Sequence, residues 1–131
     1  MSKLLVFPVA GVAAAAVLLA APGAVAKSGP RVIETGPCSA ASDWKLKVKP
    51  EDGRLEVEYE VDQNVNGDKW RVVLRHNGAR FARVTKTTRP PSGSFEVRRL
   101  VNDAAGKDRI RGRATNLRTG EVCIGRAVFT A

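Results

Sequence analysis

The sequence has few of the side chains on which most enzymes depend. Its 131 residues include one histidine, His76, and two cysteines, and aromatic residues make up only 5% of the chain. It contains no glycine-rich phosphate loop, no paired metal ligands and no nucleophile motif. Catalysis by acids, bases and nucleophiles needs such groups close together, so we expect a protein that is not an enzyme and that has no cofactor or metal.

The one long apolar run stands at the N-terminus. Lys3 precedes an alanine-rich stretch, residues 4–21, and small residues around Ala26 follow. This order predicts a secretory signal peptide, residues 1–26. An uncleaved membrane anchor is the alternative, because the stretch is just long enough to span a bilayer. We favour cleavage, which predicts a secreted, extracellular protein without a membrane span.

Cleavage after Ala26 leaves 105 residues, the size of one domain. We expect residues 27–37 to be a flexible N-terminal segment and residues 38–131 to form the domain, as a monomer. Two cysteines in an oxidising compartment form a disulfide, so Cys38 and Cys123 are predicted to pair. This bond would join the two ends of the domain.

Apolar and charged residues alternate with a period of two through most of the domain, which is typical of β-strands. The first two strands, residues 44–49 and 55–61, are predicted to form a hairpin around a four-residue turn, residues 50–53. One register satisfies both faces of this hairpin. Its pairs are Trp44 with Tyr59, Leu46 with Val57, Val48 with Leu55, Lys45 with Glu58, and Lys47 with Glu56.

A second hairpin is predicted around Asn77-Gly78, a strong two-residue turn signal. A regular ladder sets Leu74 opposite Phe81, whereas a one-residue bulge sets Val72 opposite Val84. Further strands bring the total to seven, at residues 44–49, 55–61, 70–75, 79–87, 94–101, 108–115 and 121–130. Seven short antiparallel strands favour an all-β immunoglobulin- or fibronectin-like sandwich, with Trp44 and Trp70 in its core. A small β-barrel is the alternative.

Four stretches of the domain carry a family resemblance: Ser42–Lys47, Glu56–Asn64, Gly67 and Trp70–Leu74. In these stretches the chain resembles small exported proteins of unknown function that are common in actinomycetes. The likeness covers most of residues 38–128. It implies an immunoglobulin-like exported domain of a bacterium, and it implies no known activity or site.

Basic side chains are concentrated in the second half of the chain. Residues 27–69 carry 7 basic and 9 acidic side chains, whereas residues 70–131 carry 14 basic and 4 acidic ones. The candidate polyanion-binding residues are Arg98, Arg109, Arg111, Arg113, Arg80 and Arg83. Because guanidinium groups grip phosphates, they predict binding to anionic polymers such as wall teichoic acid or nucleic acid, or to anionic lipid. The alternative is a solvated basic face without a specific partner.

Residues 62–68 match the opening of a calcium-binding loop, with oxygen ligands at alternate positions and Gly67 for the sharp turn. The candidate ligands are Asp62, Asn64, Asn66 and Asp68. Val73 stands where such a loop needs a glutamate, and these residue types also form ordinary turns. We therefore expect a plain turn, with calcium as the weaker alternative.

Two further segments bear on function. His76 adjoins the Asn77-Gly78 turn, so we expect a plain surface histidine. The loop Thr87–Ser94 contains Arg89-Pro90-Pro91, which is stiff and lowers the ordering cost of binding. This loop favours an alternative function, a secreted inhibitor or protein-interaction domain whose partner is an extracellular protein.

Overall fold

The computed structural model of the protein describes residues 30–130, so the expected signal peptide lies outside the described residues. This part of the chain forms eight antiparallel strands and no helix. The strands are β1 (Val32–Pro37), β2 (Asp43–Glu51), β3 (Arg54–Asp62), β4 (Lys69–His76), β5 (Ala79–Thr87), β6 (Ser94–Asn102), β7 (Lys107–Asn116) and β8 (Val122–Thr130). Residues 30–130 therefore offer no helix with the length and apolar character that a membrane crossing requires.

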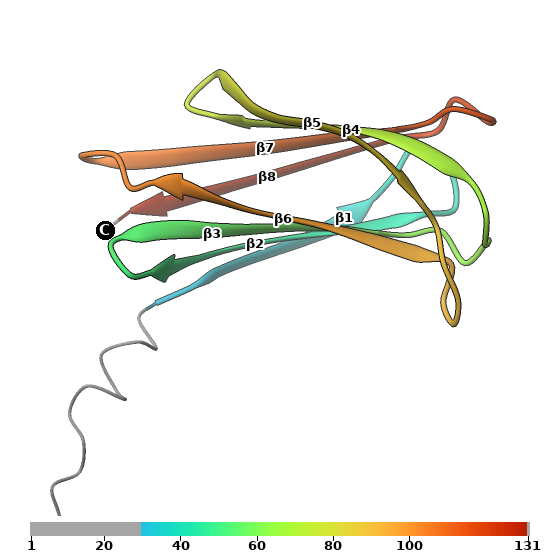
Figure 1. Cartoon of the computed structure of the whole chain (residues 1–131), viewed down its shortest axis with the longest axis horizontal. Coiled ribbons are helices and arrows are strands. Elements are labelled where there is room, and N and C mark those ends of the chain that lie inside the picture. The colour runs from blue at the N-terminus through green and yellow to red at the C-terminus, as the bar shows by residue number, and fades with distance from the viewer. Residues whose placement is uncertain (1–29, 131) are drawn as a thin grey trace, which may run out of the picture.

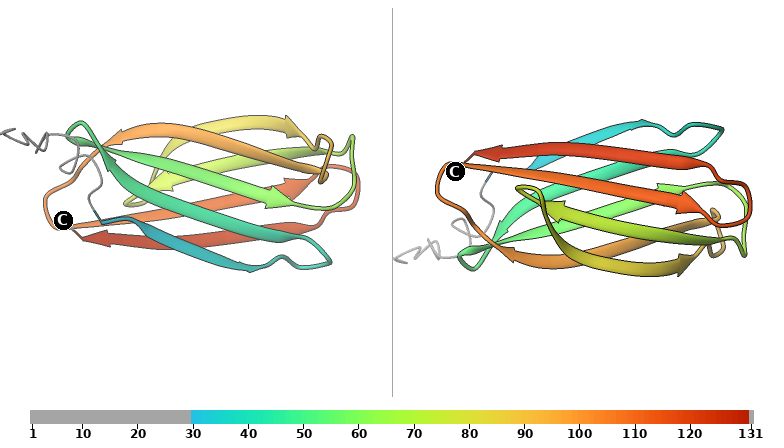
Figure 2. Two further views of the ribbon diagram at one scale, coloured as in Figure 1. Left: turned by 90° about the horizontal axis from the view of Figure 1, so that it is seen from below. Right: turned by 90° about the horizontal axis from the view of Figure 1, so that it is seen from above.

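The strands form two sheets that lie face to face (Figure 1). The first sheet has the order β1-β2-β3-β6, and the second has the order β5-β4-β7-β8. Figure 2 shows the outer side of the first sheet from below and the outer side of the second from above. The all-β sandwich is thus confirmed, and the two separate sheets differ from the single closed sheet of the barrel alternative.

The prediction of seven strands is wrong, because β1 is an eighth. This strand lies within residues 27–37, which we expected to be flexible, and it pairs with β2 from Val32 opposite Val48 to Pro37 opposite Asp43. Most of its side chains are exposed at the edge of the sheet. An edge strand of this kind has no apolar alternation to detect, and it is defined by backbone pairing.

The β2–β3 hairpin keeps its predicted faces but not its predicted partners. Leu46 lies opposite Tyr59 and Val48 opposite Val57, which shifts the register by two residues. The physical reason is the turn, which is a two-residue turn at Asp52 and Gly53, with φ of 49° and 77°, rather than four residues long. A shift of two preserves the side-chain alternation, so the same residues face the core.

Of the two registers that the sequence allows for the β4–β5 hairpin, the structure has the one with a bulge. Val72 lies opposite Val84 and Leu74 opposite Ala82, and the register shifts after Leu74. Phe81 is therefore the extra residue, and it stays partly buried against the core. The turn at Asn77-Gly78 is as predicted.

Two aromatic rings fill space that strand glycines leave open between the sheets. Tyr59 is fully buried, and its ring carbons lie 2.8 Å from where a Cβ on Gly112 would stand. Its hydroxyl donates a hydrogen bond of 2.9 Å to the carbonyl of Cys123 in the opposite sheet. The half-buried Trp44 ring lies as close to the Cβ positions of Gly36 and Gly125. Trp44 therefore lies at the edge of the core, whereas the second tryptophan is fully buried, as predicted.

The predicted disulfide between Cys38 and Cys123 joins the loop after β1 to β8, and so links the two sheets. Hydrogen bonds reinforce this junction. The buried carboxylate of Glu121 accepts bonds from the backbone of Ala40 and from the backbone and hydroxyl of Ser42, at 2.7–3.0 Å. Covalent and polar contacts therefore hold the same corner of the sandwich.

We predict that Gly112→Ala destabilises the protein. A new Cβ would stand 2.8 Å from the Tyr59 ring, and overpacking of this kind costs about 1–3 kcal/mol. This outweighs the gain of about 0.5–1 kcal/mol expected from replacing glycine in a strand. Urea unfolding measures the change. Thr115→Ala, on the outer face of the same strand, is the control, and equal stability of the two variants would contradict the packing account.

We also predict that replacing both cysteines by serine lowers the free energy of unfolding. The bond closes a loop of 85 residues, for which the chain-entropy model gives about 4.5 kcal/mol. Denaturant unfolding of the double variant, with the reduced wild type as control, measures this loss. A loss below about 1 kcal/mol would show that hydrogen bonds alone hold the corner.

Candidate polyanion-binding face

The outer face of the second sheet is lined by basic side chains from all four strands. We call this surface the arginine face, and its basic residues are Lys69, Arg71, Arg75, Arg80, Arg83, Lys107, Arg109, Arg111, Arg113 and Arg126. The cross-strand pairs place these side chains on one side of the sheet. The right-hand view of Figure 2 shows that no other described element covers this side. All ten side chains are exposed except Arg111, which is half-buried.

Strand alternation and the bulge together gather the arginines. On β7, Ile110, Gly112 and Ala114 point into the core, which turns the residues between them outward. On β5, Arg80 and Arg83 are three residues apart, and regular alternation would put them on opposite faces. Because the bulge adds one residue between them, both lie on the arginine face.

The arginine face carries no carboxylate. Its outward positions on the four strands hold basic, aliphatic or threonine residues. Among the described residues, none of its ten basic side chains takes part in an ion pair within 4.0 Å. The positive charges of this surface are therefore left to solvent and its ions.

On the first sheet, by contrast, basic side chains pair with carboxylates, and Arg98 is one of these basic residues. Arg98 lies on β6, where its guanidinium contacts Glu58 at 2.7 Å and Glu56 at 3.5 Å. Lys47 pairs with Glu58 at 2.6 Å. Burial raises the pKa of Glu58, but the hydrogen bonds with Lys47 and Glu56 outweigh this effect and bring the pKa to about 2. Arg98 is thus separated from the other five predicted polyanion-binding arginines, which share the arginine face.

Two hollows open on the arginine face. The larger, about 360 Å³, is bordered by Arg75, Arg109, Arg111 and Arg126. The smaller, about 180 Å³, is bordered by Arg75, Arg111, Arg113 and Val73. Arg75 and Arg111 border both hollows.

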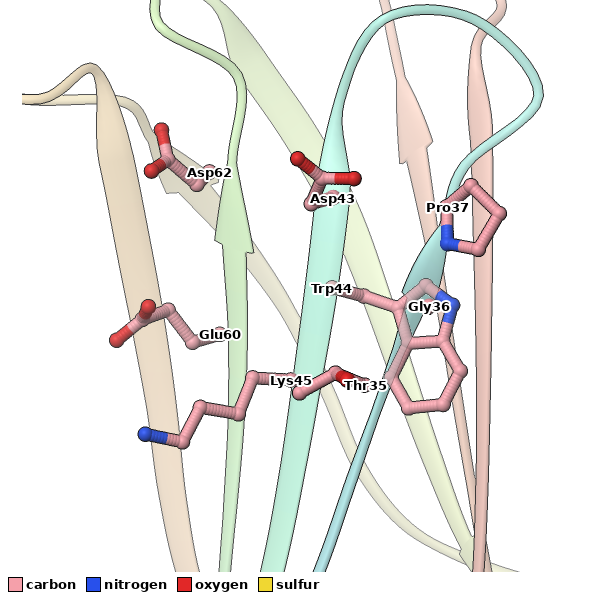
Figure 3. Close-up of a pocket in the computed structure, with 8 residues that line it drawn as sticks. All are labelled: Thr35, Gly36, Pro37, Asp43, Trp44, Lys45, Glu60 and Asp62. Carbon is pink, nitrogen blue, oxygen red and sulfur yellow. The ribbon is translucent and has the colours of Figure 1, made fainter.

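A third hollow, of about 430 Å³, lies at the first sheet over β1, β2 and β3 (Figure 3). Its lining includes three carboxylates, Asp43, Glu60 and Asp62, and the side chain of Lys45. It holds none of the predicted arginines, and its three carboxylates repel anions. Across residues 30–130, no cluster of three or more histidine, cysteine or acidic side chains is arranged to hold a metal ion.

The calcium candidate is divided by the fold. Asp62 lines the third hollow and accepts a bond from the backbone of Asn64 at 3.2 Å, whereas both oxygens of Asp68 bind the guanidinium of Arg118 at 2.7–2.8 Å. Asp68 also accepts bonds from two side-chain amides, those of Gln63 and Asn116. Arg118 first, and then these amides, hold the pKa of Asp68 far below its usual range. This carboxylate serves a structural network, and the calcium site stays a prediction that the fold does not favour.

His76 is not the plain surface histidine that we expected. Its side chain is only 17% exposed, and its Nε2 lies 2.6 Å from Oδ1 of the fully buried Asp108. Burial raises the pKa of Asp108, but bonds from the backbone of Ala104 and from His76 outweigh this and lower it. The sequence contains a signal for the burial of Asp108, because Asp108 stands two residues before Ile110 and so points to the same, inward side of β7. None of the residues lining the adjacent hollow carries a hydroxyl or thiol.

The loop Thr87–Ser94 is closed by its own backbone bonds. Arg89 and Ser94 exchange hydrogen bonds of 3.0 and 3.2 Å, and Gly93 donates to Arg89 at 2.9 Å. Gly93 also sits so close to the backbone of Val65 that a Cβ would overlap it. A protein-binding role for this loop stays a prediction.

Comparisons with protein-family models, curated proteins and solved structures found no significant match. The family resemblance therefore remains a prediction. The described part of the chain is an all-β sandwich with one disulfide and a carboxylate-free basic face.

We predict that the Asp68–Arg118 pair stabilises the protein fully above about pH 4 and progressively less as the pH falls below that value. The pKa of Asp68 is lower in the folded protein than in an unfolded chain, about 3.9. Its contribution is therefore complete above that value and is lost as pH falls through the folded-state pKa. The stability difference between wild type and Arg118→Gln should shrink between pH 7 and about pH 2. Urea unfolding at both pH values measures it, and a difference that does not change with pH would contradict the ion pair.

Proposed function

We propose that the protein is a secreted, non-catalytic binding module that holds anionic polymers of the cell envelope against its arginine face. The observation that carries this proposal is a surface of ten basic side chains across four strands with no carboxylate among them. The disulfide between Cys38 and Cys123 is compatible with an oxidising setting outside the cytoplasm.

The composition of the arginine face suits phosphate-bearing chains. Eight of its ten basic residues are arginine, whose planar fork donates two parallel hydrogen bonds to a phosphate. Along β7 the outward arginines repeat about every 7 Å. A long polymer can therefore follow a strand and meet one guanidinium after another without a pocket for each unit.

The contrast between the two sheets favours binding over simple solubility. A surface that only needs to stay soluble mixes charges of both signs. The first sheet does this through pairs such as Lys47 with Glu58 and Lys49 with Glu56. The arginine face instead bears the repulsion among its like charges. Anions that neutralise it would remove this cost.

We predict that the protein is retained on an immobilised polyphosphate column and is eluted by salt. Because binding releases counterions, the logarithm of the binding constant should fall linearly with the logarithm of the salt concentration. The steepness of this line should decrease by roughly one for each arginine removed. Arg109→Gln combined with Arg113→Gln should therefore lower both the eluting salt concentration and the slope.

The matched control is Arg54→Gln combined with Arg99→Gln. These arginines are exposed on the first sheet, so this double variant has the same net charge as the test variant. It should elute close to the wild type. The proposal fails if the wild type is not retained at low salt, or if both double variants lose retention equally.

A further inference from the structure

Four arginines of the arginine face stand directly opposite one another across all four strands. In order from β5 to β8, this arginine row consists of Arg80, Arg75, Arg111 and Arg126. Neighbouring strands are about 4.8 Å apart, so the row places four positive charges across roughly 15 Å. No other line of directly paired residues across this sheet holds arginine on every strand.

The arginine row has an electrostatic cost that no described side chain offsets. Like charges directly opposite each other destabilise a sheet. None of the four guanidinium groups contacts a carboxylate in the described part of the chain. Arg75 donates one bond, of 3.3 Å, to the carbonyl of Gly78, which leaves its charge unneutralised.

Arg111 is the centre of the row. It is half-buried, whereas the other three are exposed. Its Nε is buried and has no hydrogen-bond partner among the described residues, which is costly for a charged group. Arg111 also borders both hollows of the arginine face, together with Arg75. The side chain that carries this buried donor thus borders two hollows lined by guanidinium groups.

We infer that the arginine row is a subsite for a tetrahedral oxyanion, a phosphate or sulfate group, seated in the larger hollow between Arg75, Arg111 and Arg126. This inference rests on the proposed function and makes it more specific: the recognised unit of the polymer is a tetrahedral group rather than a carboxylate. The group takes bonds from the forks around it and neutralises the row.

The number of guanidinium groups around the larger hollow favours a tetrahedral anion over a planar carboxylate as the ligand. One guanidinium fork satisfies both oxygens of a carboxylate. Three guanidinium groups from three adjacent strands offer more donors than a planar group with two oxygens can accept. A tetrahedral group presents its oxygens in several directions, so it can engage three forks at once and carries up to two negative charges near neutral pH.

The test is calorimetric titration of the folded protein with pyrophosphate, sulfate and the tricarboxylate citrate, at constant ionic strength in chloride. We expect pyrophosphate or sulfate to bind at about one site per chain and citrate to bind at least tenfold more weakly. The stronger of the two tetrahedral anions identifies the group that the polymer carries. Citrate binding as tight as that of both tetrahedral anions would overturn the inference.

Two variants, each of which keeps the positive charge, distinguish the arginine row from the rest of the arginine face. Arg111→Lys removes the fork at the centre of the row, and Arg83→Lys does the same on the arginine face outside both hollows. Loss of a charge-assisted bond should weaken pyrophosphate or sulfate binding by roughly tenfold in Arg111→Lys. Arg83→Lys should change it by less than about twofold. Circular dichroism confirms that both variants are folded.

The two proposals fail in different ways. Both lysine variants keep the net charge, so the polyphosphate column should retain both of them, with Arg111→Lys eluting at a somewhat lower salt concentration because its fork is lost. If the column retains all three proteins but Arg111→Lys and Arg83→Lys bind the small anions equally, the row is no special site and only the further inference fails. If the wild type is not retained on the column, the proposed function fails as well.

Discussion

The structure depends on how the aromatic side chains of the first sheet pack on glycines of the second. Tyr59 occupies the space beside Gly112 and Gly125, and its hydroxyl bonds the backbone of β8. This contact fixes which side of β7 faces the core. Because side chains alternate along a strand, the same contact turns the arginines of β7 to the outside. Packing inside the sandwich therefore determines where its positive charge appears.

The two outer faces of the sandwich differ in whether their basic side chains are paired with carboxylates. On the first sheet, lysines and Arg98 meet glutamates across the strands, and the pKa of Glu58 reflects that neutralisation. On the second sheet, arginines meet arginines. A chain that can pair its charges on one face and does not do so on the other bears a local electrostatic cost, and an external anion is the simplest means of relieving it.

Much of the fold could be predicted because its signals are local. Alternation located seven strands, the Asn77-Gly78 turn located a hairpin, and two cysteines in one domain left a single pairing. Prediction failed where the signal is not local. The β1 strand lacks apolar alternation, and the partners in the first hairpin depend on a turn of two residues rather than four. The contact between His76 and Asp108 joins residues on different hairpins, and only the packed strands bring them together.

The sequence by itself determined the period of the strands, the excess of arginine in the second half and the identity of the disulfide, since each depends on residue type and order. Only the tertiary structure decided which basic residues act together. It moved Arg98 into an ion-pair network on the other sheet, and it brought Arg80 and Arg83 to one face through a bulge. It also aligned arginines from four strands into one row. Cross-strand register and the pairing of sheets set these relations, and neither is written in the spacing of residues along one strand.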